Sequence, residues 1–133
     1  MQIVGPIDVE EAVAAELLAV LPSGTTVTAY PPPDNLAPVT VSVMSLGSYE
    51  QSAVTDWYDL VVYVWASTYS EAYAMGFSVA GAIRALRFNA TQTHFNTSEA
   101  NAPYEDPDPD RQTLRRCTVR ATVGVRGVGI TLQ

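Results

Sequence analysis

The sequence predicts an α+β fold in which a mostly antiparallel sheet is packed by two helices. Two segments place apolar residues at helical spacing, and four others alternate or run apolar as strands do. The chain has 133 residues, a length typical of one domain that forms its core without disulfides or metals. We therefore expect a single domain over residues 1–133.

The first helix is expected directly after Asp8. Asp8 and Glu11 form a capping-box pattern, in which the two side chains bond the free amides of the first turn. Residues 22–24, Pro-Ser-Gly, end the helix. Its buried stripe is expected to comprise Val9, Val13, Leu17, Val20 and Leu21.

Two short strands are expected next, on either side of a proline connector. Residues 25–30 are a β-branched run, and residues 38–46 alternate apolar and polar side chains. The three prolines of residues 31–33 make a stiff connector that cannot donate to a sheet. Residues 47–55 are polar and are expected to form a loop.

The strand from Trp57 to Trp65 differs from the others because both of its faces are apolar, Asp59 excepted. Such a strand requires cover on both sides. Because a small domain with two helices has little left for the second face, we expect a neighbouring subunit to cover it.

The second helix is expected from Ser70, its N-cap, with Glu71 placed favourably at the positive end of the helix dipole. Gly76 and Gly81 cost helix stability, which suggests that another backbone approaches closely. The apolar stripe is unusually wide and comprises Ala72, Tyr73, Met75, Phe77, Val79, Ala80, Ile83 and Leu86.

The C-terminal third is expected to hold a long loop, a long strand and a tail. Residues 88–111 are polar and acidic without a clear period, so we expect a loop. Residues 112–126 alternate strictly, with apolar side chains from Cys117 to Val125 on one face and arginines on the other. Residues 127–133, loosened by two glycines, are expected to form a tail.

The charge composition argues against a free-standing nucleic-acid binder. The chain has a formal net charge of −7, with seven arginines and no lysine. Proteins that grip nucleic acid normally carry a basic patch. The start of the chain lacks the pattern of a secretory signal, and no apolar run is long enough to span a bilayer. We therefore expect a protein made in the cytoplasm that does not enter membranes.

We find no set of residues that predicts catalysis, a metal site or a cofactor. His94 is the sole histidine and Cys117 the sole cysteine, which is too few for a typical zinc site. The acidic run of residues 105–110 lacks the glycine and the glutamate that an EF-hand loop needs in register. The expectation is a protein that is not an enzyme.

An acidic, proline-containing run directly precedes the arginine-rich strand. Arginine makes forked, bidentate pairs with carboxylates, which fix register and choice of partner. The same subunit or its neighbour in a ring could supply this pairing, and our hypothesis is that the acidic run pairs with Arg115, Arg116 or Arg120 of a neighbouring subunit; the alternative is an ordinary solvent-exposed face. The candidate interface residues are Glu105, Asp106, Asp108, Asp110, Arg115, Arg116, Arg120, Arg126, and Tyr73 and Phe77 on the second helix.

In order and pattern, the chain resembles the tail terminator (tail completion, or head–tail joining) proteins of long-tailed bacteriophages. The residues that carry the resemblance are the capped helix 8–21, the strand 39–46, the strand-into-helix unit 58–86 and the Asp-Pro loop that leads into strand 114–126.

The resemblance implies a virion subunit, assembled in the host cytoplasm, that forms a homohexameric ring on the head-proximal end of the tail tube. Such a ring ends tube polymerisation and meets the head connector or stopper protein, and DNA passes through its lumen without specific binding. The family has no catalytic residues. The alternatives are another neck protein, or an intracellular module that binds a protein through Tyr73 and Phe77.

Overall fold

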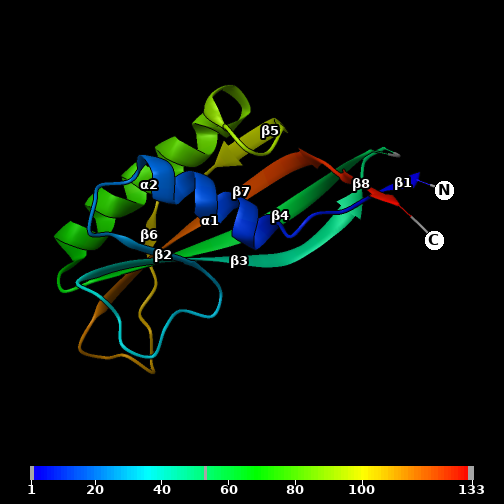
Figure 1. Cartoon of the computed structure of the whole chain (residues 1–133). Coiled ribbons are helices and arrows are strands. Elements are labelled where there is room, and N and C mark those ends of the chain that lie inside the picture. Colours follow the sequence, from blue (N-terminus) through cyan, green and yellow to red (C-terminus); the bar gives the residue numbers. More distant parts are fainter. Residues whose placement is uncertain (1, 53, 132–133) are drawn as a thin grey trace.

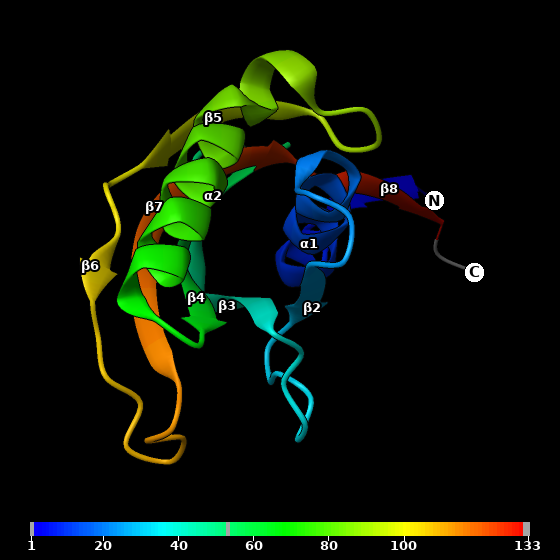
Figure 2. The same cartoon turned by 90° about the vertical axis from the view of Figure 1, so that its left-hand side faces the viewer.

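Two helices lie side by side on one face of a six-stranded sheet (Figures 1 and 2). The computed structural model describes residues 2–52 and 54–131. The helices are α1 (Val9–Val20) and α2 (Tyr69–Asn89). The strands of the sheet are β2 (Thr26–Ala29), β3 (Val39–Glu50), β4 (Thr55–Ala66), β5 (Phe95–Ala100), β6 (Tyr104–Glu105) and β7 (Arg115–Arg126). The predicted α+β class is confirmed.

The main path of the sheet runs β2-β3-β4-β7-β5, and β6 pairs separately with β7. β2 and β3 are parallel, and the other pairs are antiparallel, so the sheet is mostly antiparallel as expected. β4 is the central strand, with Val62 opposite Val43 of β3 and Val119 of β7. Its two neighbours are long, so β4 is paired along its whole length.

Helix α1 follows the sequence prediction closely. The Asp8 carboxylate accepts a hydrogen bond from the Glu11 amide at 3.3 Å, which confirms Asp8 as the N-cap. Val13 and Leu17 are fully buried against the sheet. Val20 was expected in the buried stripe, but it is 64% exposed. As the last residue of the helix it borders the open groove between α1 and α2.

Helix α2 begins earlier than predicted. Thr68, rather than Ser70, is the N-cap: its hydroxyl accepts from the Glu71 amide at 3.2 Å and donates to the Glu71 carboxylate at 3.1 Å. The close approach of another backbone, expected at the two glycines, is seen at neither: at Gly76 an added Cβ would stand 2.7 Å from the side chain of Pro103, and Gly81 faces open space. The core side of α2 comprises Ala72, Gly76, Val79, Ala80, Ile83 and Leu86.

The loop expected at residues 47–55 is largely a β-hairpin arm. β3 and β4 stay paired as far as Glu50 and Asp56. The rings of Tyr49 and Trp57 lie opposite each other, 5.9 Å apart. Cross-strand aromatic pairs stabilise such a ladder even where the remaining side chains are polar. The polar composition therefore concealed the extension.

Residues 88–111 are not the single long loop that we expected. They hold the end of α2, the edge strand β5 and the short strand β6. Phe95 and Ser98 of β5 are buried, and Ser98 lies opposite Val123 of β7. An edge strand with few apolar residues has too weak an alternation to be recognised in the sequence. β5 forms a strand because it pairs with β7, and not because of its own composition.

Part of the expected C-terminal tail also forms a strand, and residues 132–133 of that tail lie outside the described residues. β8 (Val128–Thr131) pairs antiparallel with β1 (Gln2–Gly5), which brings the two ends of the chain together (Figure 1). Gly127 is needed at the junction, because a Cβ there would collide with the Gly5 carbonyl. Among the described residues, no helix has the length and apolar character needed to cross a membrane.

Candidate assembly surfaces

The helix-free face of the sheet is the face opposite α1 and α2. It carries the second apolar set of β4, in which Trp65 and Val61 are almost completely buried. Two loops of the same chain, residues 30–38 and 106–114, lie beneath this face, at the end of the sheet where β7 begins (Figure 2). The Tyr30 ring, for example, stands 6.0 Å from that of Tyr63. The expectation that a neighbouring subunit must cover this region is therefore wrong.

Asp108 holds one of these loops against the sheet. Asp108 is 6% exposed. Its carboxylate accepts hydrogen bonds from the Trp65 indole at 2.9 Å and from the Asp110 amide at 2.9 Å. Arg111 and Arg116 approach the same carboxylate at 3.3 and 3.8 Å. These contacts satisfy a carboxylate that would otherwise be costly to bury.

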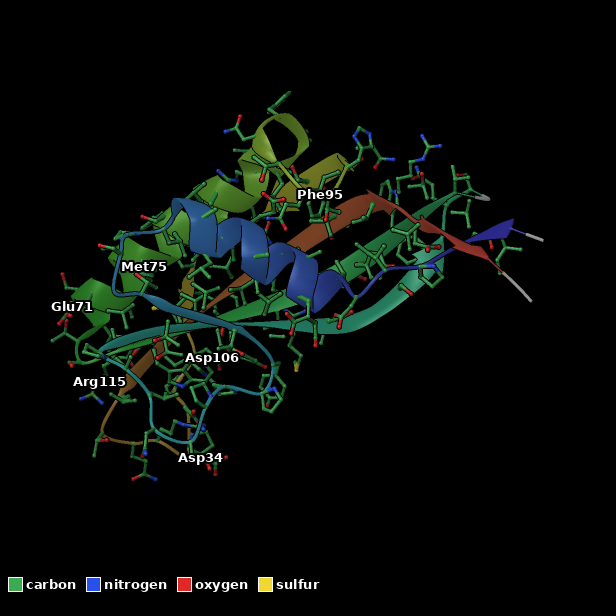
Figure 3. The ribbon with its side chains drawn as sticks, viewed as in Figure 1. Asp34, Glu71, Met75, Phe95, Asp106 and Arg115 are labelled. Carbon is green, nitrogen blue, oxygen red and sulfur yellow. The ribbon has the colours of Figure 1, made fainter. Side chains whose placement is uncertain are left out.

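Arg116 joins this loop to the sheet. Its guanidinium lies 3.3 Å from the Asp106 carboxylate and donates through Nε to the Asp106 carbonyl at 2.8 Å. The same guanidinium stands 4.6 Å from the centre of the Tyr63 ring, and the Thr118 hydroxyl donates to Asp106 at 2.6 Å. Figure 3 shows Asp106 on the side of the sheet away from the helices.

The acidic run and the arginine strand thus meet, but within one chain. We call Asp106, Asp108, Arg111 and Arg116 the Asp–Arg cluster. Asp106 and Asp108 pair with Arg116 inside the chain because the short strand β6 pairs antiparallel with β7 and returns the following residues to their own sheet; pairing between subunits stays a prediction. The Asp108 side chain, only 4% exposed, has little surface left for another subunit.

Electrostatics in the cluster favour the charged carboxylate. Burial raises the pKa of Asp108, but the hydrogen bonds from Trp65, the Asp110 amide and Arg111, with the charge of Arg116, outweigh it and lower the pKa below its usual value. Glu16 of α1 behaves alike: burial raises its pKa, and the amide bonds of Thr91 and Gln92 more than offset this.

The remaining predicted interface residues lie along β6 and β7 and in the loop between them. The Arg115 guanidinium stands 5.5 Å from the centre of the Tyr69 ring, and the Glu105 carboxylate raises the pKa of the Tyr69 hydroxyl. Arg120 donates to the Tyr104 hydroxyl at 3.3 Å. Asp110 and Arg126 are exposed at opposite ends of the region. Their proposed role between subunits stays a prediction.

Tyr73 and Phe77, predicted together, have different environments. Tyr73 is half-buried and packs beside Tyr69 against a small cluster that includes Cys117. Phe77 points outward and is 60% exposed. The sequence interpretation missed Phe88, which is 76% exposed on the same side of α2. Its spacing of eleven residues from Phe77, three helical turns, was the available signal.

Further exposed apolar residues lie on α1. Leu18 is 59% exposed, and Val20 opens into a groove of 380 Å³ between the helices. The groove is lined by Glu16, Leu17, Val20, Leu21, Pro22, Ser78, Ala82, Ala85, Leu86, Asn89 and Ala90. The outer surface of the helices thus carries four exposed large apolar residues, Leu18, Val20, Phe77 and Phe88.

The residues considered for chemistry are separated. Cys117 is fully buried, and burial raises the pKa of its thiol. His94 is exposed in the segment before β5. Within residues 2–52 and 54–131, no three His, Cys, Asp or Glu side chains gather as they would to hold a metal ion. These positions offer no nucleophile beside a base.

Comparisons with known proteins identify a shared fold. No protein-family model matches the chain, and no curated protein matches it. Among solved structures, a chain of the "Virion of native gene transfer agent (GTA) particle" superimposes with a TM-score of 0.62. The two chains are 16% identical, and the match covers 89% of this chain and 94% of the other. At this identity the likeness shows the fold alone.

Proposed function

We propose that this protein is a structural subunit of a virion, and more specifically a tail terminator. The observation that carries the proposal is the fold shared with a chain of a gene transfer agent virion, over nearly the full length of both chains. Function does not follow from fold alone. The order and pattern of elements in the sequence, which resemble those of the tail terminator family, support the narrower assignment.

In this role the protein forms a homohexameric ring on the head-proximal end of the tail tube. It contacts the tail tube protein on one side and the head connector or stopper protein on the other. DNA passes through the lumen without specific binding, which agrees with a net charge of −7 that repels phosphate. The role is structural and requires no catalytic residue or cofactor.

Removing the gene from the genome that produces the particles tests this role. Without a terminator, tube polymerisation continues, so electron microscopy is expected to show over-long tails that lack heads. A copy of the wild-type gene supplied in trans should restore tails of uniform length with heads attached.

Two results would contradict the assignment in different ways. Tails of normal length that do not join heads would identify a different neck protein. Normal particles in normal number would exclude an essential structural role in the virion altogether. The alternative of an intracellular protein-binding module would then be favoured.

A further inference from the structure

The outward surface of α2 carries an apolar stripe. Phe77, Gly81, Arg84 and Phe88 follow one another at helical spacing on the side opposite the core residues of the helix. Both phenylalanines are mostly exposed, and Gly81 has open space where a Cβ would stand. Large apolar side chains grouped in this way on a soluble surface usually mark a contact site.

The outward surface of α1 carries a second stripe. Glu11, Ala15 and Leu18 are exposed on one side of the helix, opposite the buried Val13 and Leu17. The other glutamates of α1 already bind within the chain: Glu10 accepts from the Ser45 amide at 2.7 Å, and Glu16 binds residues 91 and 92. Among the described residues Glu11 has no ion-pair partner.

The two stripes match in spacing when the helices run antiparallel. Leu18 opposite Phe77 places Glu11 opposite Arg84, because each pair of residues is seven positions apart, about 10 Å along a helix. In this register Ala15 lies level with residue 80, one position from Gly81, the exposed small residue of the second stripe. The small residues Ala15 and Gly81 let the two helices approach closely. The apolar contact of Leu18 with Phe77 lies toward one end of the pair, and the ion pair of Glu11 with Arg84 lies toward the other.

The two stripes also match in charge. Residues 1–83 contain no lysine or arginine, so the surface of α1 offers carboxylates without any competing cation. Arg84 and Arg87 lie on the last turns of α2. Arg84 donates through Nε to the Ala100 carbonyl at 2.9 Å, and its two Nη groups have no hydrogen bond within the described part of the chain.

We infer that α1 of one copy packs antiparallel against α2 of a second copy, with Leu18 on Phe77 and Glu11 beside Arg84. The occupant is a second copy because this chain itself carries the surface that matches in size, spacing and charge. The contact deepens the proposed self-association and rests on it. The residues of both stripes are exposed, and the two helices lie on the same face of the sheet (Figure 2), so a single partner can meet both stripes in a pair, or two neighbours can each meet one in a ring.

The apolar half of the contact is tested with Phe77→Ser. Phe77 is exposed, so the variant should fold normally, while its self-association in sedimentation and native mass measurements should weaken at least about tenfold, equivalent to about 1.4 kcal/mol. Val4→Ser is the matched control, because Val4 is 43% exposed on β1, away from both helices. Equal association of Phe77→Ser and the wild type would overturn the inference.

The charged half is tested by mixing two variants. Glu11→Arg places two cations in the contact, and Arg84→Glu places two anions there, so each variant alone should remain monomeric. In a one-to-one mixture both contacts between unlike copies pair opposite charges, and association should return. Association can return in the mixture only if both variants are folded, so its return would also show that neither variant has lost its fold. If association does not return, the result would count against the contact. Asp34→Arg, in the loop below the sheet, is the control for changed net charge (Figure 3).

The test separates this contact from the proposed function. A wild-type protein that stays monomeric at all concentrations would overturn the contact, and the deletion experiment on particles would still decide the function. Conversely, recovery in the mixture together with normal particles from the deletion would support the contact and reject the terminator role.

Discussion

The two faces of the central strand β4 are covered by different kinds of interaction. On the helix face, Val62 and Val64 pack against apolar residues of α1 and α2. On the helix-free face, Trp65 is buried beneath a loop that a buried carboxylate and two arginines hold in place. Hydrophobic burial depends on area and close packing, whereas the second arrangement depends on charge. The same strand is therefore buried on both sides, and the loop that covers the helix-free face should respond to acid through Asp108.

The largest effect is expected on the helix face. Ile83→Ala removes a fully buried side chain from the contact of α2 with the sheet and should lower the free energy of unfolding by about 2–5 kcal/mol. Urea unfolding measures this loss, which should be similar at pH 7 and pH 5. Leu18→Ala, on the outer surface, is the control and should change stability by less than about 0.5 kcal/mol under monomeric conditions. Equal effects would mean that α2 is not seated as described.

A smaller loss is expected on the helix-free face from Asp108→Asn. The amide keeps an acceptor for the Trp65 indole but removes the charge that faces Arg111 and Arg116, so unfolding should become easier by about 1–3 kcal/mol. Asp110→Asn is the matched control, because Asp110 is exposed and makes no ion pair among the described residues. A loss of similar size in both variants would place the effect in the loop's backbone rather than in the cluster.

Lowering the pH should reproduce, in the wild type, part of the stability loss expected for Asp108→Asn. The folded-state pKa values of Asp108 and Glu16 lie below their ordinary values of 3.8 and 4.5, so the unfolded state binds these protons more readily. Their contribution is complete above the ordinary values and disappears as pH falls through the lower folded-state values. Unfolding measured between pH 6 and pH 3 should show this decline. The double variant Asp108→Asn/Glu16→Gln should have a flatter profile; parallel profiles would refute the assignment.

Two glycine substitutions with effects of opposite sign distinguish the inner and outer surfaces of α2. Gly76→Ala brings a methyl group against Pro103 and should destabilise the fold by about 1–3 kcal/mol. Gly81→Ala meets nothing in the monomer and should stabilise the helix by up to about 1 kcal/mol. Thermal unfolding of the two variants side by side checks the opposite signs. A destabilised Gly81→Ala monomer would show that this surface is covered within the chain.

Much of the fold follows from local patterns in the sequence. The Asp8 cap, the buried Val13 and Leu17, and the alternation of β7 are confirmed, since each depends on residues within one or two turns of each other. The patterns failed where pairing came from elsewhere in the chain. β5 and β8 have weak alternation of their own and exist because β7 and β1 lie beside them.

The candidate site shows the same division. Carboxylates and arginines were expected to pair, and Asp106 and Asp108 do pair with Arg116. The expected partner was another subunit, because a one-dimensional pattern contains no information on where the chain returns. The hydrogen bond from the Trp65 indole to Asp108 spans 43 residues, and no local signal predicts it.

By itself, the sequence determined which side chains of β7 share a face, where α1 begins, and that charge of both signs concentrates before and along β7. Backbone periodicity and capping chemistry are local, so these features do not depend on the rest of the chain. Only the tertiary structure decided what covers each face. It placed the acidic run under its own sheet and left Phe77, Phe88 and Leu18 at the surface, because burial depends on the order of the strands and the return of the loops, and both are long-range properties.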